Sequence, residues 1–155
     1  MSSDYDLLYK QLTSLLEDER HFMPNIANTC ALIYGNLSNI NWCGFYFVIG
    51  GELVLSSFQG KPACMRIPLS KGVCGTAASQ NKTMVVDDVH KFSGHIACDC
   101  ESKSEIVVPI RYNNKVIGVF DVDSPIYNRF TNNEKIFFEK ICKYLETSCD
   151  FDNIK

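Results

Sequence analysis

Apolar residues recur at helical spacing in three segments near the two ends of the chain. The first is a leucine-rich stretch within residues 4–16, and the second begins at Pro24 and ends near Ser38. The third follows Thr131, which can cap a helix, and continues to about Ser148. We expect the inner stripe of this closing helix to contain Ile136, Phe137, Ile141 and Leu145. The pattern therefore predicts helices at both ends of the chain.

Between these segments, short runs of aromatic and β-branched residues predict strands. The expected strands cover residues 40–49, 52–58, 64–67, 83–86, 105–111 and 115–122. Gly50–Gly51 and Asn113–Asn114 are turn signals that make hairpins of two pairs of them, and residues 71–80 read as a short helix. We expect an α+β fold with a central antiparallel sheet of about six strands and the terminal helices packed on it. No repeat or linker divides the chain, so one domain is expected over residues 1–155.

The composition excludes several classes of function. The chain has 155 residues, of which 46% are hydrophobic, and a net charge of -3, so it offers no broad basic field to nucleic acid. Its apolar runs are far shorter than the roughly 20 residues of a membrane-spanning helix, so no membrane contact is expected. The N-terminus lacks the features of a secretory signal, and we therefore expect a cytoplasmic protein. In that reducing compartment, eight cysteines indicate thiol chemistry or metal binding.

The stretch from Asp88 to Glu105 carries the densest chemistry of the chain, with two histidines, two cysteines and several acidic residues. It has no helical period, so we expect a loop that holds Cys98 over a pocket. Cys64 and Cys74 lie upstream, and either is a candidate for a second thiol that closes a disulfide with Cys98. Cys74 lies near the N-terminal end of the expected short helix, where the helix dipole would favour a thiolate.

A zinc site is the alternative use of this loop. The four residues with suitable side chains are His90, His95, Cys98 and Cys100. Their spacing, H-x4-H-x2-C-x-C, matches no common zinc module, so we expect no metal. The chain also has neither a P-loop nor a G-x-G-x-x-G motif, and no cofactor is expected.

The strand that begins near residue 40 has a face suited to a small ligand. Trp42, Gly44 and Tyr46 alternate onto one side of it, because side chains in a strand point to opposite faces in turn. The glycine between two large rings leaves either a tolerated packing gap or a hollow with aromatic walls.

Asp121 and Asp123 are two positions apart on the last expected strand and therefore share a face. Burying both is costly unless a proton or a cation joins them, and their proximity would raise one pKa so that one acid donates a proton at neutral pH. The alternative is that both are solvated at the end of the strand. Glu105 begins the hairpin partner and is expected to point into the same volume. Three carboxylates beside an aromatic hollow suit a small ligand with an ammonium group and an apolar tail.

Several blocks of the sequence together resemble the free methionine-(R)-sulfoxide reductases, which are built on a single GAF domain. The blocks are QGKPACMRIP, KGVCGTA, DDVHKFSGHIACD, SKSEIVVPI and GVFDVDS, and the match extends from about Ile40 to Phe130. The resemblance implies a GAF-like fold and the reduction of free L-methionine (R)-sulfoxide to methionine through a cysteine sulfenic acid. It also implies thioredoxin as the reductant and a homodimer. The preference for the R form rests on the resemblance alone.

The resemblance also implies roles for individual residues. Cys98 would attack the sulfoxide sulfur, Cys64 would resolve the sulfenic acid, and Cys74 would be a secondary or alternative resolving thiol. The residues implied to bind the substrate are Trp42, Tyr46, Glu105, Asp121 and Asp123. The expected chemistry agrees with these roles, because a sulfoxide oxygen must be protonated as its sulfur is attacked, and a carboxylic acid beside a thiolate supplies both groups.

Cys100 departs from the pattern of the family, in which the second position after the nucleophile is not generally cysteine. It is either a competing resolving thiol or an inert neighbour of Cys98. A second class of function also stays open, in which a GAF module binds a small ligand or senses redox state without turnover. Conversion of free methionine sulfoxide by the purified protein with dithiothreitol would separate this sensor from an enzyme.

Overall fold

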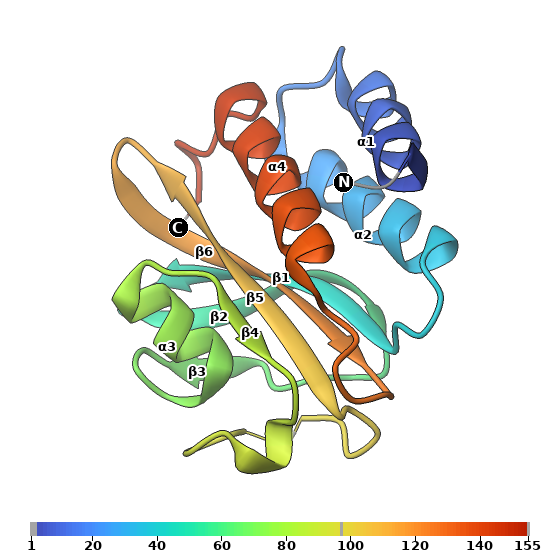
Figure 1. The fold of residues 1–155 in the computed structure, drawn as a ribbon. Helices are drawn as coiled ribbons and strands as arrows, with labels where there is room; N and C mark the ends of the chain where they lie inside the picture. Colours follow the sequence, from blue (N-terminus) through green and yellow to red (C-terminus); the bar gives the residue numbers. More distant parts are fainter. Residues whose placement is uncertain (1–2, 97, 155) are drawn as a thin grey trace.

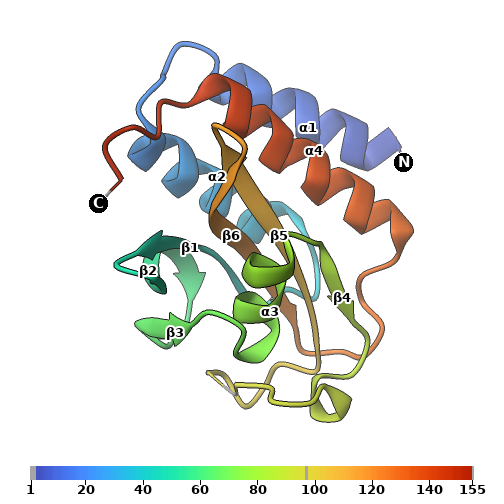
Figure 2. The same ribbon diagram turned by 90° about the vertical axis from the view of Figure 1, so that its left-hand side faces the viewer.

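A curled antiparallel sheet forms the centre of the molecule, with helices on both of its faces (Figure 1 and Figure 2). The computed structural model describes residues 3–96 and 98–154. Within these residues the strands are β1 (Trp42–Ile49), β2 (Glu52–Gly60), β3 (Arg66–Pro68), β4 (Met84–Val86), β5 (Ser104–Tyr112) and β6 (Lys115–Ser124). The helices are α1 (Ser3–Leu16), α2 (Phe22–Asn36), α3 (Gly72–Gln80) and α4 (Asn132–Ser148), with a short 3-10 turn η1 (Val89–Lys91).

The six strands follow the order β3-β2-β1-β6-β5-β4, and every neighbouring pair is antiparallel. Both predicted hairpins are confirmed. Gly50 and Gly51 join β1 to β2 with φ of +62° and +84°, and Asn113 and Asn114 join β5 to β6 with φ of +52° and +63°. These left-handed conformations suit the right-handed twist of a tight hairpin. The two hairpins then meet along β1 and β6, which are distant in the sequence.

Alternating side chains of β1 contribute to two separate cores. Phe45 and Phe47 belong to the core between the sheet and the layer of α1, α2 and α4, whereas Trp42 and Tyr46 belong to the core on the α3 side. Figure 2 shows the sheet curling around α3, with the other three helices on the opposite side. Phe45 stacks on Phe120 with 4.5 Å between the ring centroids, and neither residue has exposed surface. Burial of each such ring contributes about 2–3 kcal/mol to stability.

The closing helix α4 begins as its sequence predicts. The Thr131 hydroxyl accepts a hydrogen bond from the Asn133 backbone N–H, and the Glu134 side chain accepts one from the Thr131 backbone N–H, so both halves of a capping box are present. Phe137 forms part of the buried stripe, but the placement of Ile136 in that stripe is wrong, because Ile136 is 41% exposed. The buried apolar members are Phe137, Phe138, Ile141, Cys142 and Leu145.

The predicted fold class is confirmed, since an antiparallel sheet carries the N- and C-terminal helices on one side. Several predicted boundaries differ from the structure by one or two residues, including the start of the third strand and the start of the second helix. The third strand is Arg66–Pro68, so Cys64 lies in the irregular segment before it, and α2 begins at Phe22, two residues ahead of Pro24. His21 makes this earlier start possible, because its Nδ1 accepts a hydrogen bond from the Met23 backbone N–H. Within the described residues, no helix is long and apolar enough to cross a membrane.

Candidate active site

The register of three adjacent strands brings the acidic and aromatic side chains onto one face. Asp123 of β6 lies opposite Trp42 of β1 and opposite Glu105 of β5, and Asp121 lies opposite Gly44. Directly opposed residues in a sheet point to the same side, so these groups converge on the α3 side. They line a single cavity together with Tyr46, Cys74, Cys98 and His95. The expectation that Glu105 points into the same volume as the two aspartates is confirmed.

Trp42 forms the apolar wall of this cavity. Its ring stacks on Phe58 with 5.4 Å between centroids, and its Nε1 donates a hydrogen bond of 3.1 Å to the Lys61 carbonyl. A Cβ at Gly44 would collide with both the Trp42 ring and Phe58. Of the two alternatives, the hollow with aromatic walls is confirmed, since Trp42 and Tyr46 both line the cavity, but the space directly beside Gly44 is filled by the Trp42 ring and Phe58. Glycine is needed there so that the ring can lie flat against the strand.

Cys64 and Cys98 form a disulfide across the mouth of the cavity, with 5.7 Å between their Cα atoms. The bond joins the segment before β3 to the loop between η1 and β5, which are 34 residues apart in the sequence. The Tyr46 hydroxyl donates a 2.8 Å hydrogen bond to the Cys64 carbonyl and so holds this cysteine against β1. Three thiols were left open by the sequence as partners of Cys98, namely Cys64, Cys74 and Cys100, and the structure pairs Cys64.

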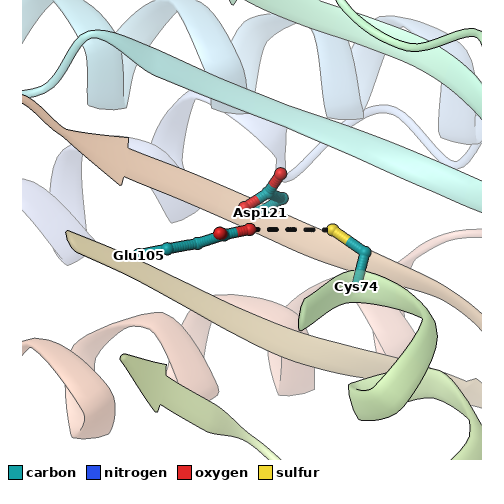
Figure 3. Close-up of side chains that lie close together, drawn as sticks. All are labelled: Cys74, Glu105 and Asp121. Atoms are coloured by element: carbon teal, nitrogen blue, oxygen red, sulfur yellow. Dashed lines mark hydrogen bonds between the residues drawn. The ribbon is translucent and has the colours of Figure 1, made fainter. Parts of the chain in front are cut away.

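Cys74 is the third residue of α3, is 4% exposed and carries a free thiol. Its Sγ–H donates to Glu105 Oε1 across 3.9 Å (Figure 3). Burial, followed by the nearby Asp121 and Glu105 carboxyls, raises the pKa of this thiol well above its ordinary value. The prediction that the helix dipole favours a thiolate at Cys74 is therefore wrong, because desolvation and negative neighbours outweigh a half-charge at one helix end.

The three carboxyl groups of the cavity are all shifted toward the protonated form. Burial, reinforced by Asp123, raises the pKa of Glu105 to about 8, and burial raises the pKa values of Asp121 and Asp123 well above their usual range. Asp121 Oδ1 is buried and has no hydrogen-bond partner among the described residues. His95 Nε2 lies 3.7 Å from Glu105 Oε2, but burial lowers the pKa of His95, so at neutral pH the two form a polar contact without charge.

Asn41 is a residue of the site that reasoning from the sequence missed. Its Nδ2 donates hydrogen bonds of 3.0 Å to Asp99 Oδ2 and to Ser102 Oγ, and its backbone N–H donates to the Asp123 carbonyl at 3.0 Å. It therefore fastens the loop that carries Cys98 to the start of β1. The only signal in the sequence was a polar amide immediately before a strand, which is too common to identify a functional position.

The loop residues that were weighed as a zinc site are not all brought together. His95 and Cys98 line the cavity, whereas His90 and Cys100 do not. Cys100 is exposed and free, and His90 is an exposed partner of Asp88.

The chain is similar to proteins of known family and structure. The GAF domain family matches residues 12–148. The free methionine-R-sulfoxide reductase of Escherichia coli is 46% identical over 142 residues, which cover 92% of this chain and 86% of that protein. A structure called fRMsr of Staphylococcus aureus, in complex with substrate, is 53% identical with a TM-score of 0.90 and covers 96% of this chain and 97% of that one. The free methionine-R-sulfoxide reductase of Neisseria meningitidis, also in complex with its substrate, is 38% identical with a TM-score of 0.89, covering 96% and 91%.

The fold and the site together define a GAF domain whose ligand cavity carries a cysteine pair and buried acids. Sequence identity places the chain within one family of GAF proteins, since a relative that is 46% identical aligns with 92% of the chain. The chain belongs to the free methionine-R-sulfoxide reductase family.

Proposed function

We propose that this protein reduces free L-methionine (R)-sulfoxide to methionine. The observation that carries the proposal is the disulfide between Cys64 and Cys98 at the mouth of a cavity whose floor holds protonated carboxyl groups. A thiol that attacks and an acid that protonates are the two groups that sulfoxide reduction requires. Relatives that carry the name of this activity support the choice of substrate and of its R form.

Cys98 is the nucleophile in this mechanism. With the disulfide reduced, the Cys98 thiolate attacks the sulfoxide sulfur while the Glu105 carboxyl, with its pKa raised to about 8, gives a proton to the oxygen. The attack joins the Cys98 sulfur to the substrate sulfur in a sulfurane intermediate. The hydroxyl then moves from the substrate sulfur to the Cys98 sulfur while both the new S–S bond and the S–O bond of the substrate break, so methionine leaves as a thioether and Cys98 carries a sulfenic acid. The Cys64 thiol then attacks the Cys98 sulfur, a molecule of water leaves, and the observed disulfide forms. The structure therefore corresponds to the state after one turnover.

The buried acids also explain a preference for the free amino acid. The three carboxyl groups of Asp121, Asp123 and Glu105 cannot all be charged at once without a cation beside them. The ammonium group of a free amino acid supplies that cation. A methionine within a peptide has no such charge. Trp42 offers an apolar face to the methyl group and sulfur of the substrate. In the disulfide state the cavity measures about 40 Å³, room for about three water molecules, so the substrate enters after the disulfide opens.

The reductant and the assembly also belong to this proposal. Both disulfide cysteines are half-buried at the cavity mouth, so a protein dithiol such as thioredoxin can approach them. The resemblance to the family supports thioredoxin, a homodimer and a cytoplasmic location, and the family match over residues 12–148 supports a single domain for the whole chain. Cys74 has no resolving role here, because it is buried, protonated and hydrogen-bonded to Glu105.

Turnover assays with cysteine variants test the proposal. Purified protein with dithiothreitol should convert free methionine sulfoxide to methionine, and Cys98→Ser should abolish conversion. Cys64→Ser should form the sulfenic acid but lose recycling by thioredoxin, and Cys100→Ser is the matched control that should keep both. Loss of recycling in Cys100→Ser alone would overturn the role of Cys64. Binding of methionine sulfoxide without any conversion would favour a ligand sensor.

Substrate analogues test the role of the acids separately. N-acetylmethionine sulfoxide keeps the reacting sulfoxide but has no ammonium group, so its kcat/KM should fall by about 100-fold, the loss expected when a charged partner worth about 3 kcal/mol is removed. Equal turnover of the two compounds would refute the argument from charge.

A further inference from the structure

Three side chains from three different elements point at one another inside the cavity. Cys74 of α3, Glu105 of β5 and Asp121 of β6 each place a ligand atom within 4.8 Å of the others, and all three residues are buried (Figure 3). His95 Nε2 lies 3.7 Å from Glu105 Oε2 and lines the same cavity. One thiol and two carboxyls therefore surround a single small volume, and the His95 imidazole contacts one of these carboxyls.

Asp121 supplies an independent sign that this volume lacks a ligand. Its Oδ1 has no hydrogen-bond partner among the described residues, although the residue is only 6% exposed. A buried polar atom without a partner destabilises the folded protein, so a group that binds and satisfies it is favoured. The established contacts of the cluster, from Cys74 to Glu105 and from His95 to Glu105, do not reach this oxygen.

We propose that Cys74, Glu105 and Asp121 form a binding site for a thiophilic divalent cation of the Zn²⁺ class, which excludes the substrate while it is bound. The thiol fits this class, since thiolate ligands favour Zn²⁺, whereas Mg²⁺ and Ca²⁺ prefer sites made of oxygen alone. The metal takes the place of the protons on the carboxyl and thiol groups, which pass to solvent. The cation has no part in sulfoxide reduction and acts as an inhibitor.

The distances are close to those that tetrahedral zinc requires. Bonds of about 2.0–2.3 Å in a tetrahedron separate the ligand atoms by about 3.3–3.8 Å. The distance from Cys74 Sγ to Glu105 Oε1 is 3.9 Å, and the ligand atoms of Cys74, Glu105 and Asp121 all lie within 4.8 Å of one another. Side-chain rotations that shorten the widest separation by about 1 Å bring these three atoms to zinc-binding distance, and a solvent molecule can take the fourth position.

The disulfide makes this site separable from ordinary zinc binding to catalytic thiols. In the oxidised protein Cys64 and Cys98 are bonded to each other and offer no thiolate. Among the described free cysteines, Cys74 lines the cavity, Cys100 is exposed outside it, and the remaining four lie buried in the core beneath α1, α2 and α4. A metal–thiolate bond in the cavity of the oxidised protein therefore requires Cys74.

Cobalt titration of the oxidised protein, without reductant, tests the binding. Co²⁺ should give a saturable thiolate-to-cobalt charge-transfer band in the near ultraviolet with one metal per chain, and Zn²⁺ should displace it. Cys74→Ser should remove the band, and Asp121→Asn should weaken Co²⁺ affinity by at least ~10-fold, because loss of even an outer partner of a metal site costs about 10–100-fold. Cys100→Ser, as the matched control, should behave like the parent protein.

The outcomes separate this inference from the proposed function. A band that survives in Cys74→Ser, one that is lost in Cys100→Ser, or no saturable band in the folded parent protein would each overturn the metal site. Circular dichroism establishes that each variant is folded. Because this titration involves no turnover, its result stands whether or not the protein reduces methionine sulfoxide. The inhibitory consequence alone rests on the proposed function, and Zn²⁺ should raise the KM for methionine sulfoxide in the parent protein.

Discussion

Replacing Glu105 by glutamine should change how the stability of the protein depends on pH. Burial raises the pKa of Glu105 to about 8 from an ordinary value of 4.5, so the folded protein holds a proton that the unfolded chain releases between these two values. For a carboxyl shifted upward, the stabilisation is complete below pH 4.5 and is lost as the pH rises toward 8. Glutamine is similar in shape to the neutral acid and cannot ionise, so the variant should escape this loss.

The size of the effect follows from the shift. At about 1.4 kcal/mol per pKa unit, a change from 4.5 to about 8 corresponds to about 5 kcal/mol. At pH 5 the variant and the parent protein should therefore unfold at nearly the same free energy. At pH 8 the variant should be more stable by about 4–5 kcal/mol, as an upper value, because Asp121 and Asp123, whose pKa values are also raised, adjust to the change beside them.

Urea unfolding of the oxidised proteins at several pH values between 5 and 8 measures this difference. Titration of groups elsewhere cancels when the variant is compared with the parent at each pH. Glu139→Gln on the outer face of α4 is the matched control, since that side chain is exposed and should shift stability by less than about 0.5 kcal/mol at every pH. A difference between Glu105→Gln and parent that stays constant from pH 5 to 8 would refute the assignment of a protonated buried acid.

Three further changes test other parts of the structure. Opening the disulfide between Cys64 and Cys98, which spans 34 residues, should lower the free energy of unfolding by about 4 kcal/mol. Urea unfolding with and without dithiothreitol measures this change, and an equal effect of dithiothreitol on Cys98→Ser would contradict it. Asn41→Ala removes two hydrogen bonds to the loop and should lower kcat/KM by about 5- to 100-fold while hydrogen exchange in the loop rises; unchanged exchange would argue against a fastening role. Phe120→Ala, in the helix-side core, should cost about 3–5 kcal/mol of stability and leave the KM unchanged, and a raised KM would show that the two cores are not independent.

The sequence predicted the parts of this site that depend on local pattern, but not those that depend on contacts between distant segments of the chain. The two-residue spacing of Asp121 and Asp123 and the turn before β6 placed both aspartates and Glu105 on one face, because hairpin register follows from local pattern. The pairing of β1 with β6, which sets Trp42 opposite Asp123, joins segments about 80 residues apart, and no local pattern encodes it.

The two thiol candidates show the same limit. Cys64 and Cys74 both lie upstream of Cys98, and spacing alone did not choose between them as its partner. The choice depends on depth in the folded protein, since Cys74 is 4% exposed beneath the loop, whereas Cys64 is half-buried at the mouth of the cavity. The dipole argument failed at Cys74 for the same reason, because the cost of desolvating a thiolate is set by tertiary packing.

The two faces of β1 belong to different cores, and this limits where residues can be inserted into the chain. A shift of one residue in this strand would turn the side chains of Trp42 and Tyr46 toward the core beneath α1, α2 and α4, and would turn Phe45 toward the carboxyl groups of the cavity. A single-residue insertion within β1 should therefore abolish both substrate binding and folding. Extra residues at the exposed Gly50–Gly51 tip alter neither face and should be tolerated. Insertions into this hairpin should therefore be tolerated at the turn between β1 and β2 but not within either strand.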